Sequence, residues 1–150
     1  MVQKEIINNF LACSKIAVVG VSRSGKKFGN SVLKELRKKG YSVFPINANA
    51  IEIEGEKCFG RVSQLPEKVD GVVVVVSPNE SVKILKDAES AGIKNIWLQQ
   101  GSESAEAVDF CNDNCINVVY GHCILMFVEP AEFFHRAHRW INGLTGKLPK

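Results

Sequence analysis

The five consecutive valines Val72–Val76 limit most strongly what this chain can fold into. β-branched residues favour strands, and an uninterrupted apolar run fits a strand that is covered on both faces. The next three residues, Ser77-Pro78-Asn79, stop the run and can cap a helix that follows it. A buried strand followed by a helix is typical of a parallel sheet with helices packed against it.

Other apolar runs of strand length alternate with segments of helical period along the chain. Phe28, Val32, Leu33 and Leu36 fall on one helical stripe, and Gly40 is placed to end that helix. The pattern predicts strands over 16–21, 42–46, 72–76, 95–98 and 116–119, and helices over 28–39, 80–91 and 103–114. We therefore predict an α/β fold: a Rossmann-like, doubly wound, mainly parallel five-stranded sheet with helices on both faces.

We expect residues 1–150 to form a single domain, with an N-terminal helix over 2–13 and a C-terminal helical extension over 130–150. The length suits one hydrophobic core, and no linker or internal repeat interrupts the pattern. Pro45, inside the second strand, indicates an irregular strand or one at the edge of the sheet. Residues 51–66 are a polar connector.

The composition excludes several classes of protein. With 45% hydrophobic and 23% charged residues, the chain is not predicted to be disordered. Its longest apolar run is far shorter than the roughly 20 residues that cross a bilayer, and the first residues lack the pattern of a secretory signal. The five cysteines have irregular spacings that do not indicate a disulfide framework, so we expect a reducing, cytoplasmic location.

Ligands of doubly wound sheets bind beyond the carboxyl ends of the strands, near the point where the strand order reverses. This rule selects residues 20–29, 47–49, 77–79 and 99–102. The first of these segments joins a strand to a helix and combines glycines with Ser22, Arg23 and Lys26. Glycines permit close backbone approach, and hydroxyls, cations and helix N–H groups bind phosphate. We therefore predict a phosphate-binding loop in this segment.

Two sharper phosphate motifs are incomplete in this loop. A Walker A motif needs a serine or threonine after its lysine, but Lys27 follows Lys26. Ser22 replaces the second glycine of the dinucleotide fingerprint, and Asn47 stands where an acid would bind a ribose. Hydrolysis of a nucleoside triphosphate is thus disfavoured. The incomplete fingerprint also weakens the hypothesis that the chain binds NAD(P), which stays an alternative.

Several short segments occur in an order and spacing that are specific only in combination. They are residues 17–23 (AVVGVSR), Gly29, residues 40–47 (GYSVFPIN), residues 53–55 (IEG), residues 69–70 (VD) and residues 97–101 (WLQQG). Together they resemble the CoA-binding domain family, small stand-alone proteins related to the nucleotide-binding domain of succinyl-CoA synthetase. The resemblance covers residues 14–123 and departs from the family where Ala48, and not proline, follows Asn47.

The resemblance implies that coenzyme A is the ligand and that the first loop receives its phosphates. Ser22, Arg23 and Lys26 would face these phosphates. The segments after the second and third strands would flank the adenosine or the diphosphate, and the turn at 100–101 would border the pantetheine. The predicted ligand-binding residues are Gly20, Val21, Ser22, Arg23, Lys26, Gly29, Asn47, Asn49, Ser77, Pro78, Gln100 and Gly101.

Histidines and cysteines late in the chain raise other hypotheses. His122 and Cys123 follow the last strand and could serve a redox or thiol enzyme. His135 and His138 could meet one metal ion on a helix, but no compact set of four ligands supports a metal site. No nucleophile, base and orienting group occur together, so we assign no catalytic residue and favour binding over catalysis.

We predict a module that binds or senses coenzyme A or an acyl-CoA without evident catalysis. The alternatives are an NAD(P)-binding redox or thiol enzyme and a nucleotide-responsive regulator. Residues 133–150 hold four Lys or Arg residues and no acid, but we expect them to pack on the domain or on a second copy and not on nucleic acid. The sequence does not decide whether the chain forms a homo-oligomer or binds a partner enzyme, and no membrane partner is expected.

Overall fold

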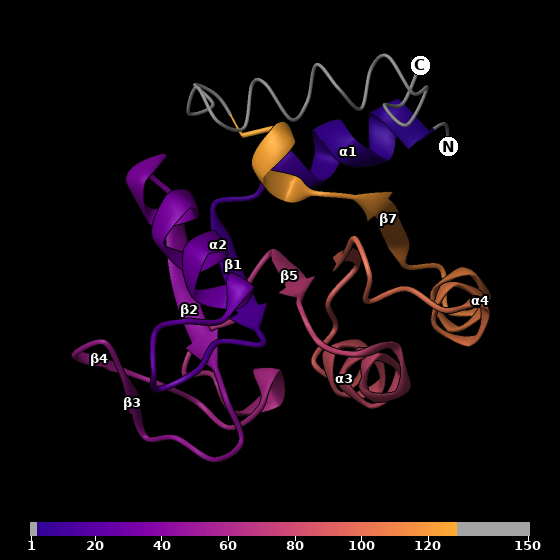
Figure 1. The fold of residues 1–150 in the computed structure, drawn as a ribbon. Helices are drawn as coiled ribbons and strands as arrows, with labels where there is room; N and C mark the ends of the chain where they lie inside the picture. The colour runs from indigo at the N-terminus through magenta and orange to yellow at the C-terminus, as the bar shows by residue number, and fades with distance from the viewer. Residues whose placement is uncertain (1–2, 129–150) are drawn as a thin grey trace.

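The computed structural model, which describes residues 3–128, is built around a parallel five-stranded sheet with the order β2-β1-β5-β6-β7 (Figure 1). The strands are β1 (Lys15–Val19), β2 (Ser42–Ile46), β5 (Gly71–Val74), β6 (Asn95–Gln99) and β7 (Asn117–His122). The chain passes from β1 outward to β2 and then returns to β5 on the other side, so the strand order reverses between β1 and β5. The predicted Rossmann-like α/β fold is confirmed.

Helices cover both faces of the sheet, as Figure 1 shows. One face carries α1 (Gln3–Leu11) and α2 (Phe28–Lys38), and the other carries α3 (Pro78–Ser90) and α4 (Ala105–Asp113). The smaller elements are the antiparallel pair β3 (Glu52–Ile53) and β4 (Glu56–Lys57), and the 3₁₀ helices η1 (Val62–Gln64) and η2 (Ile124–Met126). The buried residues of η2 join the core under α1 and α2.

Two hydrophobic cores arise from the alternation of side chains along the strands. Val18, Val73 and Trp97 face α1 and α2, whereas Val72 and Val74 face α3 and α4. All five side chains are fully buried. Burial on both faces explains why the valine run has no polar interruption.

Four strands end at residues other than those that the sequence indicates, and one of them, β6, ends one residue late at Gln99. β1 ends at Val19, two residues early, because Gly20 has a φ of 114°, outside the strand region. β5 ends at Val74, which leaves Val75–Val76 half-buried beyond the sheet. β7 continues to His122, and its register against β6 shifts near the carboxyl end. These changes all fall at the sheet edge where ligands of this fold class bind.

The helix α1 and the edge strand β2 lie where the sequence indicates. α1 lies inside the range 2–13, while the helical extension expected over 130–150 lies outside the described residues. Pro45 sits in β2, an edge strand of the sheet, where the missing N–H group of proline is tolerated. Within residues 3–128, no helix is both long enough and apolar enough to cross a membrane.

Candidate functional site

A cleft of about 550 Å³ opens at the carboxyl ends of the strands. Segments that are far apart in the sequence line it: residues 27–28, residues 75–77 with Glu80, residues 99–102, and Cys123. These segments follow β1, β5, β6 and β7, next to the point where the strand order reverses. The cleft therefore lies where a doubly wound sheet holds its ligand.

Two glycines let the loop between β1 and α2 pack against the end of β5. A Cβ on Gly20 would lie 2.0 Å from the carbonyl oxygen of Val75, and one on Gly29 would lie 2.3 Å from the carbonyl oxygen of Gly20. No side chain fits at either position. The predicted residues Gly20 and Gly29 therefore bring backbones together beside the cleft.

The side chain of Asn30 fixes the conformation of the same loop. Its Oδ1 accepts a hydrogen bond from the Ser22 backbone N–H at 2.9 Å, and its Nδ2 donates to the Ser22 carbonyl oxygen at 3.0 Å. Asn30 is only 2% exposed. Sequence reasoning missed this residue, because an asparagine in the first turn of a helix has no pattern that separates it from a surface residue.

Asn47 holds the loop from the opposite side. Its Nδ2 donates to the Val21 carbonyl oxygen at 2.8 Å, and its Oδ1 accepts from the Asn49 backbone N–H at 2.7 Å. Both functional groups of the amide are thus engaged with backbone atoms. Asn47 links the end of β2 to the loop after β1, which is a positioning role that needs no direct ligand contact.

The structure brings some of the predicted ligand-binding residues to the cleft. Ser77, Gln100 and Gly101 line it, and Pro78 begins α3 directly after Ser77. Ser22 is half-buried, and its Oγ lies 2.9 Å from the Oγ of Ser24. Ser77, Gln100 and Gly101 thus meet at one opening although they belong to two separate loops, whereas Ser22 and Pro78 are outside the lining.

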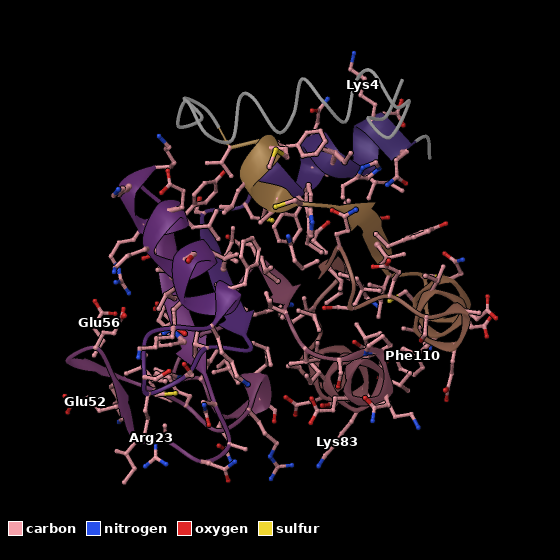
Figure 2. The ribbon with its side chains drawn as sticks, in the orientation of Figure 1. Lys4, Arg23, Glu52, Glu56, Lys83 and Phe110 are labelled. Atoms are coloured by element: carbon pink, nitrogen blue, oxygen red, sulfur yellow. The ribbon has the colours of Figure 1, made fainter. Side chains whose placement is uncertain are left out.

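Other predicted residues do not line the cleft. Gly20, Val21, Gly29 and Asn47 belong to the supporting backbone contacts. Arg23, Lys26 and Asn49 are exposed and outside the lining. Figure 2 shows the Arg23 side chain pointing outward at the periphery of the molecule.

Lys27 and Phe28 replace Arg23 and Lys26 as the first-loop residues that line the cleft. Lys27 is the N-cap of α2, no side chain caps this helix end, and its first turn holds no acid. The free N–H groups, the helix dipole and the ammonium group therefore favour an anion here. Phe28 does not belong to the core stripe of α2, contrary to the prediction: it is 45% exposed, because the apolar core residues of the helix start only at the second turn.

Buried polar groups shape the side of the cleft that follows β6. Gln99, 3% exposed, accepts a hydrogen bond from the Ile124 N–H through its Oε1 at 3.0 Å. Ser102, also 3% exposed, accepts from the Val76 N–H through its Oγ at 3.1 Å, and its carbonyl oxygen accepts from the Ser81 hydroxyl at 2.7 Å. These bonds connect the segments that follow β5, β6 and β7 into one wall of the cleft.

Cys123 contributes a thiol to the cleft, but its surroundings keep that thiol protonated. Burial raises the pKa of Cys123, although hydrogen bonds from the Gln99 side chain and the Leu125 and Met126 backbones act in the opposite direction. All five cysteines are free, and burial raises the pKa of Cys111 to about 12. Within residues 3–128 no group of three or more acids, histidines or cysteines could hold a metal ion, and His135 and His138, which the sequence analysis weighed without assigning a metal site, lie outside them.

The chain matches a known protein family over most of its length. The family model for the CoA binding domain matches residues 14–129. This chain belongs to the CoA-binding domain family. The resemblance seen in the sequence is thereby confirmed, and the matched range contains every segment that lines the cleft.

Relatives of this CoA-binding domain include large ligases and small proteins of similar size. The alpha subunit of an ADP-forming acetate–CoA ligase II from Pyrococcus furiosus is 27% identical over 120 residues, which cover 73% of this chain but 26% of that subunit. A dinucleotide-forming acetyl-coenzyme A synthetase from Candidatus Korarchaeum cryptofilum superposes with a TM-score of 0.63 at 31% identity, over 71% of this chain and 25% of that one. The domain thus spans about a quarter of that subunit and about a quarter of that synthetase chain.

A further solved structure is close to this domain in length. A conserved hypothetical protein from Pyrococcus furiosus is 44% identical, with a TM-score of 0.69, over 73% of this chain and 95% of that one. The same fold therefore occurs both as a small protein and as a part of larger ligases.

Proposed function

We propose that this CoA-binding domain holds coenzyme A or an acyl-CoA in the cleft at the carboxyl edge of the sheet. The observation that carries the proposal is the junction of Lys27 with the uncapped N-terminus of α2 at the mouth of this cleft. There the ammonium group and the free N–H groups bind the diphosphate. Arg23 and Lys26, outside the lining, attract the anionic ligand from solution.

The rest of the cleft suits the long arm of coenzyme A. Gln100 and Gly101, the two exposed residues of the turn after β6, border the cleft. The buried residues Gln99 and Ser102 hold this side of the cleft in place through their hydrogen bonds. The pantetheine arm carries amide groups that pair with such polar surfaces, while Val75–Val76 offer it apolar contact. The function that we propose is therefore binding of the whole cofactor.

We further propose that the domain acts as a binding or sensing module and catalyses no reaction by itself. Cys123 is the thiol that lines the cleft, and burial raises its pKa, so little thiolate exists at neutral pH to act as a nucleophile. In the large relatives the matched region is one part of a ligase. A partner enzyme that receives the bound acyl-CoA fits this division of roles.

The test is calorimetric titration of the full chain with coenzyme A, acetyl-CoA and NADH. Lys27→Ala should weaken coenzyme A binding by about 1–3 kcal/mol, the range for a lost charge-assisted hydrogen bond. Arg23→Ala is the matched control outside the lining, and it should cost less and lose its effect at high salt. Binding of NADH without coenzyme A would contradict the proposal and favour the NAD(P) alternative.

A further inference from the structure

Phe28 lines the cleft with an aromatic ring that is not part of the hydrophobic core. It is 45% exposed and belongs to the lining, unlike Ile51 and Tyr120, the other large hydrophobic residues exposed in the described part of the chain. An aromatic ring left in water loses the free energy that burial would give it. A ring kept accessible inside a ligand cleft therefore fits a partner that covers it.

The position of this ring is set by the residues that follow it. Gly29 is in backbone contact with Gly20, and Asn30 ties the same turn of α2 to both backbone groups of Ser22. The first turn of α2 is thus held in place, and Phe28 precedes these anchors directly. Its ring is therefore presented from a rigid backbone, which reduces the entropy lost when a ligand packs on it.

The neighbours of Phe28 indicate which part of coenzyme A reaches it. Under the proposed function, the diphosphate is held by Lys27, the residue before Phe28, and by the N–H groups of α2. Only a ribose separates that diphosphate from the adenine. The family resemblance assigns the pantetheine arm to the turn at 100–101, which is a different segment of the lining. Adenine is planar and aromatic, so it stacks on a phenyl ring with favourable geometry.

We propose that Phe28 stacks on the adenine of the bound ligand and makes the cleft selective for adenosine-bearing cofactors. This inference rests on the proposed function and adds a specificity residue to it. A cleft that recognised pantetheine and phosphate alone would accept phosphopantetheine as well as coenzyme A. Phe28 gives coenzyme A and ADP an interaction that phosphopantetheine cannot make.

The experiment compares three ligands on four proteins by calorimetry: coenzyme A, ADP and 4′-phosphopantetheine on the wild type, Phe28→Ala, Phe28→Trp and Tyr120→Ala. Phe28→Ala should raise the Kd of coenzyme A and ADP by about tenfold or more, the size of one base–aromatic stack, and leave the Kd of phosphopantetheine unchanged. Phe28→Trp should restore binding. Tyr120→Ala removes an equally exposed ring outside the lining and should change nothing.

The Phe28→Trp variant also supplies a spectroscopic signal. Adenine stacked on the new indole should quench its fluorescence when coenzyme A or ADP binds, beyond any change seen in the wild type, and phosphopantetheine should not. Wild-type affinity for coenzyme A in Phe28→Ala, or a loss confined to phosphopantetheine, would overturn the stacking proposal and leave the proposed function standing. If the wild type binds no coenzyme A, both proposals fail.

Discussion

At the scale of single residues, the loop between β1 and α2 depends on one buried amide. Asn30 satisfies the N–H and the carbonyl of Ser22, which lies in the loop that precedes Lys27 and Phe28. Backbone groups that lose such partners inside a protein cost free energy, since water cannot replace the bonds in full. Asn30 therefore couples the stability of the fold to the shape of the cleft.

We expect Asn30→Ala to lower the free energy of unfolding by about 1–3 kcal/mol and to weaken coenzyme A binding as the loop loosens. Urea unfolding and calorimetric titration measure the two effects. Ser31→Ala, at the adjacent exposed position of α2, is the control and should be nearly neutral for both. Wild-type stability in Asn30→Ala would show that the two hydrogen bonds to Ser22 contribute nothing.

At the scale of secondary-structure elements, three helices end in the same motif. After α3 the N–H of Ile93 donates to the carbonyl of Ala88, and that of Gly92 to the carbonyl of Glu89. Gly92 has the positive φ, 78°, that this ending requires. The bonds after α2 follow the same pattern, with Gly40 at φ 96°. α4 makes the same bonds, but there Cys115, with a φ of 56°, takes the place of the glycine.

We expect Cys115→Gly to raise the free energy of unfolding by about 0.5–1 kcal/mol. Glycine removes the strain of a side chain in the left-handed region, and the greater freedom of the unfolded chain offsets only a part of that gain. Cys115 is exposed, so no core contact is lost. Cys115→Ala keeps the Cβ and serves as the control in the same denaturant titration. Equal stabilities of the two variants would contradict the strain argument.

At the scale of the whole molecule, two cores share one sheet. The core under α1 and α2 contains Phe10 of α1, whose ring meets Trp97 of β6 edge-on at a centroid distance of 5.5 Å. The neighbouring residues Ile96 and Leu98 face the opposite core. Because alternate residues of one strand belong to different cores, we expect the two cores to unfold together.

We therefore expect Phe10→Ala to destabilise the molecule as a unit. The loss should be about 3–5 kcal/mol, the usual cost of emptying a buried phenyl site. Circular dichroism and tryptophan fluorescence should follow the same single unfolding transition. Two transitions at separate denaturant concentrations would show that the two cores unfold independently, contrary to this expectation.

The sequence by itself determined the elements and their architecture. The valine run, the helical stripes and the glycines are local patterns, and they follow from the covering of strands on both faces and from backbone sterics. Because such patterns repeat over a few residues, they predicted the strands, the helices, the sheet type and three of the segments that contribute residues to the cleft. The family resemblance rested on the same local segments and was confirmed.

Only the tertiary structure decided which residues within those segments reach the cleft. The lining combines residues 27–28, 75–77, 99–102 and Cys123, whose proximity depends on how far each strand runs and how each loop is tied down. A helical stripe cannot show that Phe28 precedes the packed turns and faces the opening. Charge counts likewise cannot separate Lys27 from Arg23, because the direction of each side chain is set by backbone contacts such as those of Gly29 and Asn30.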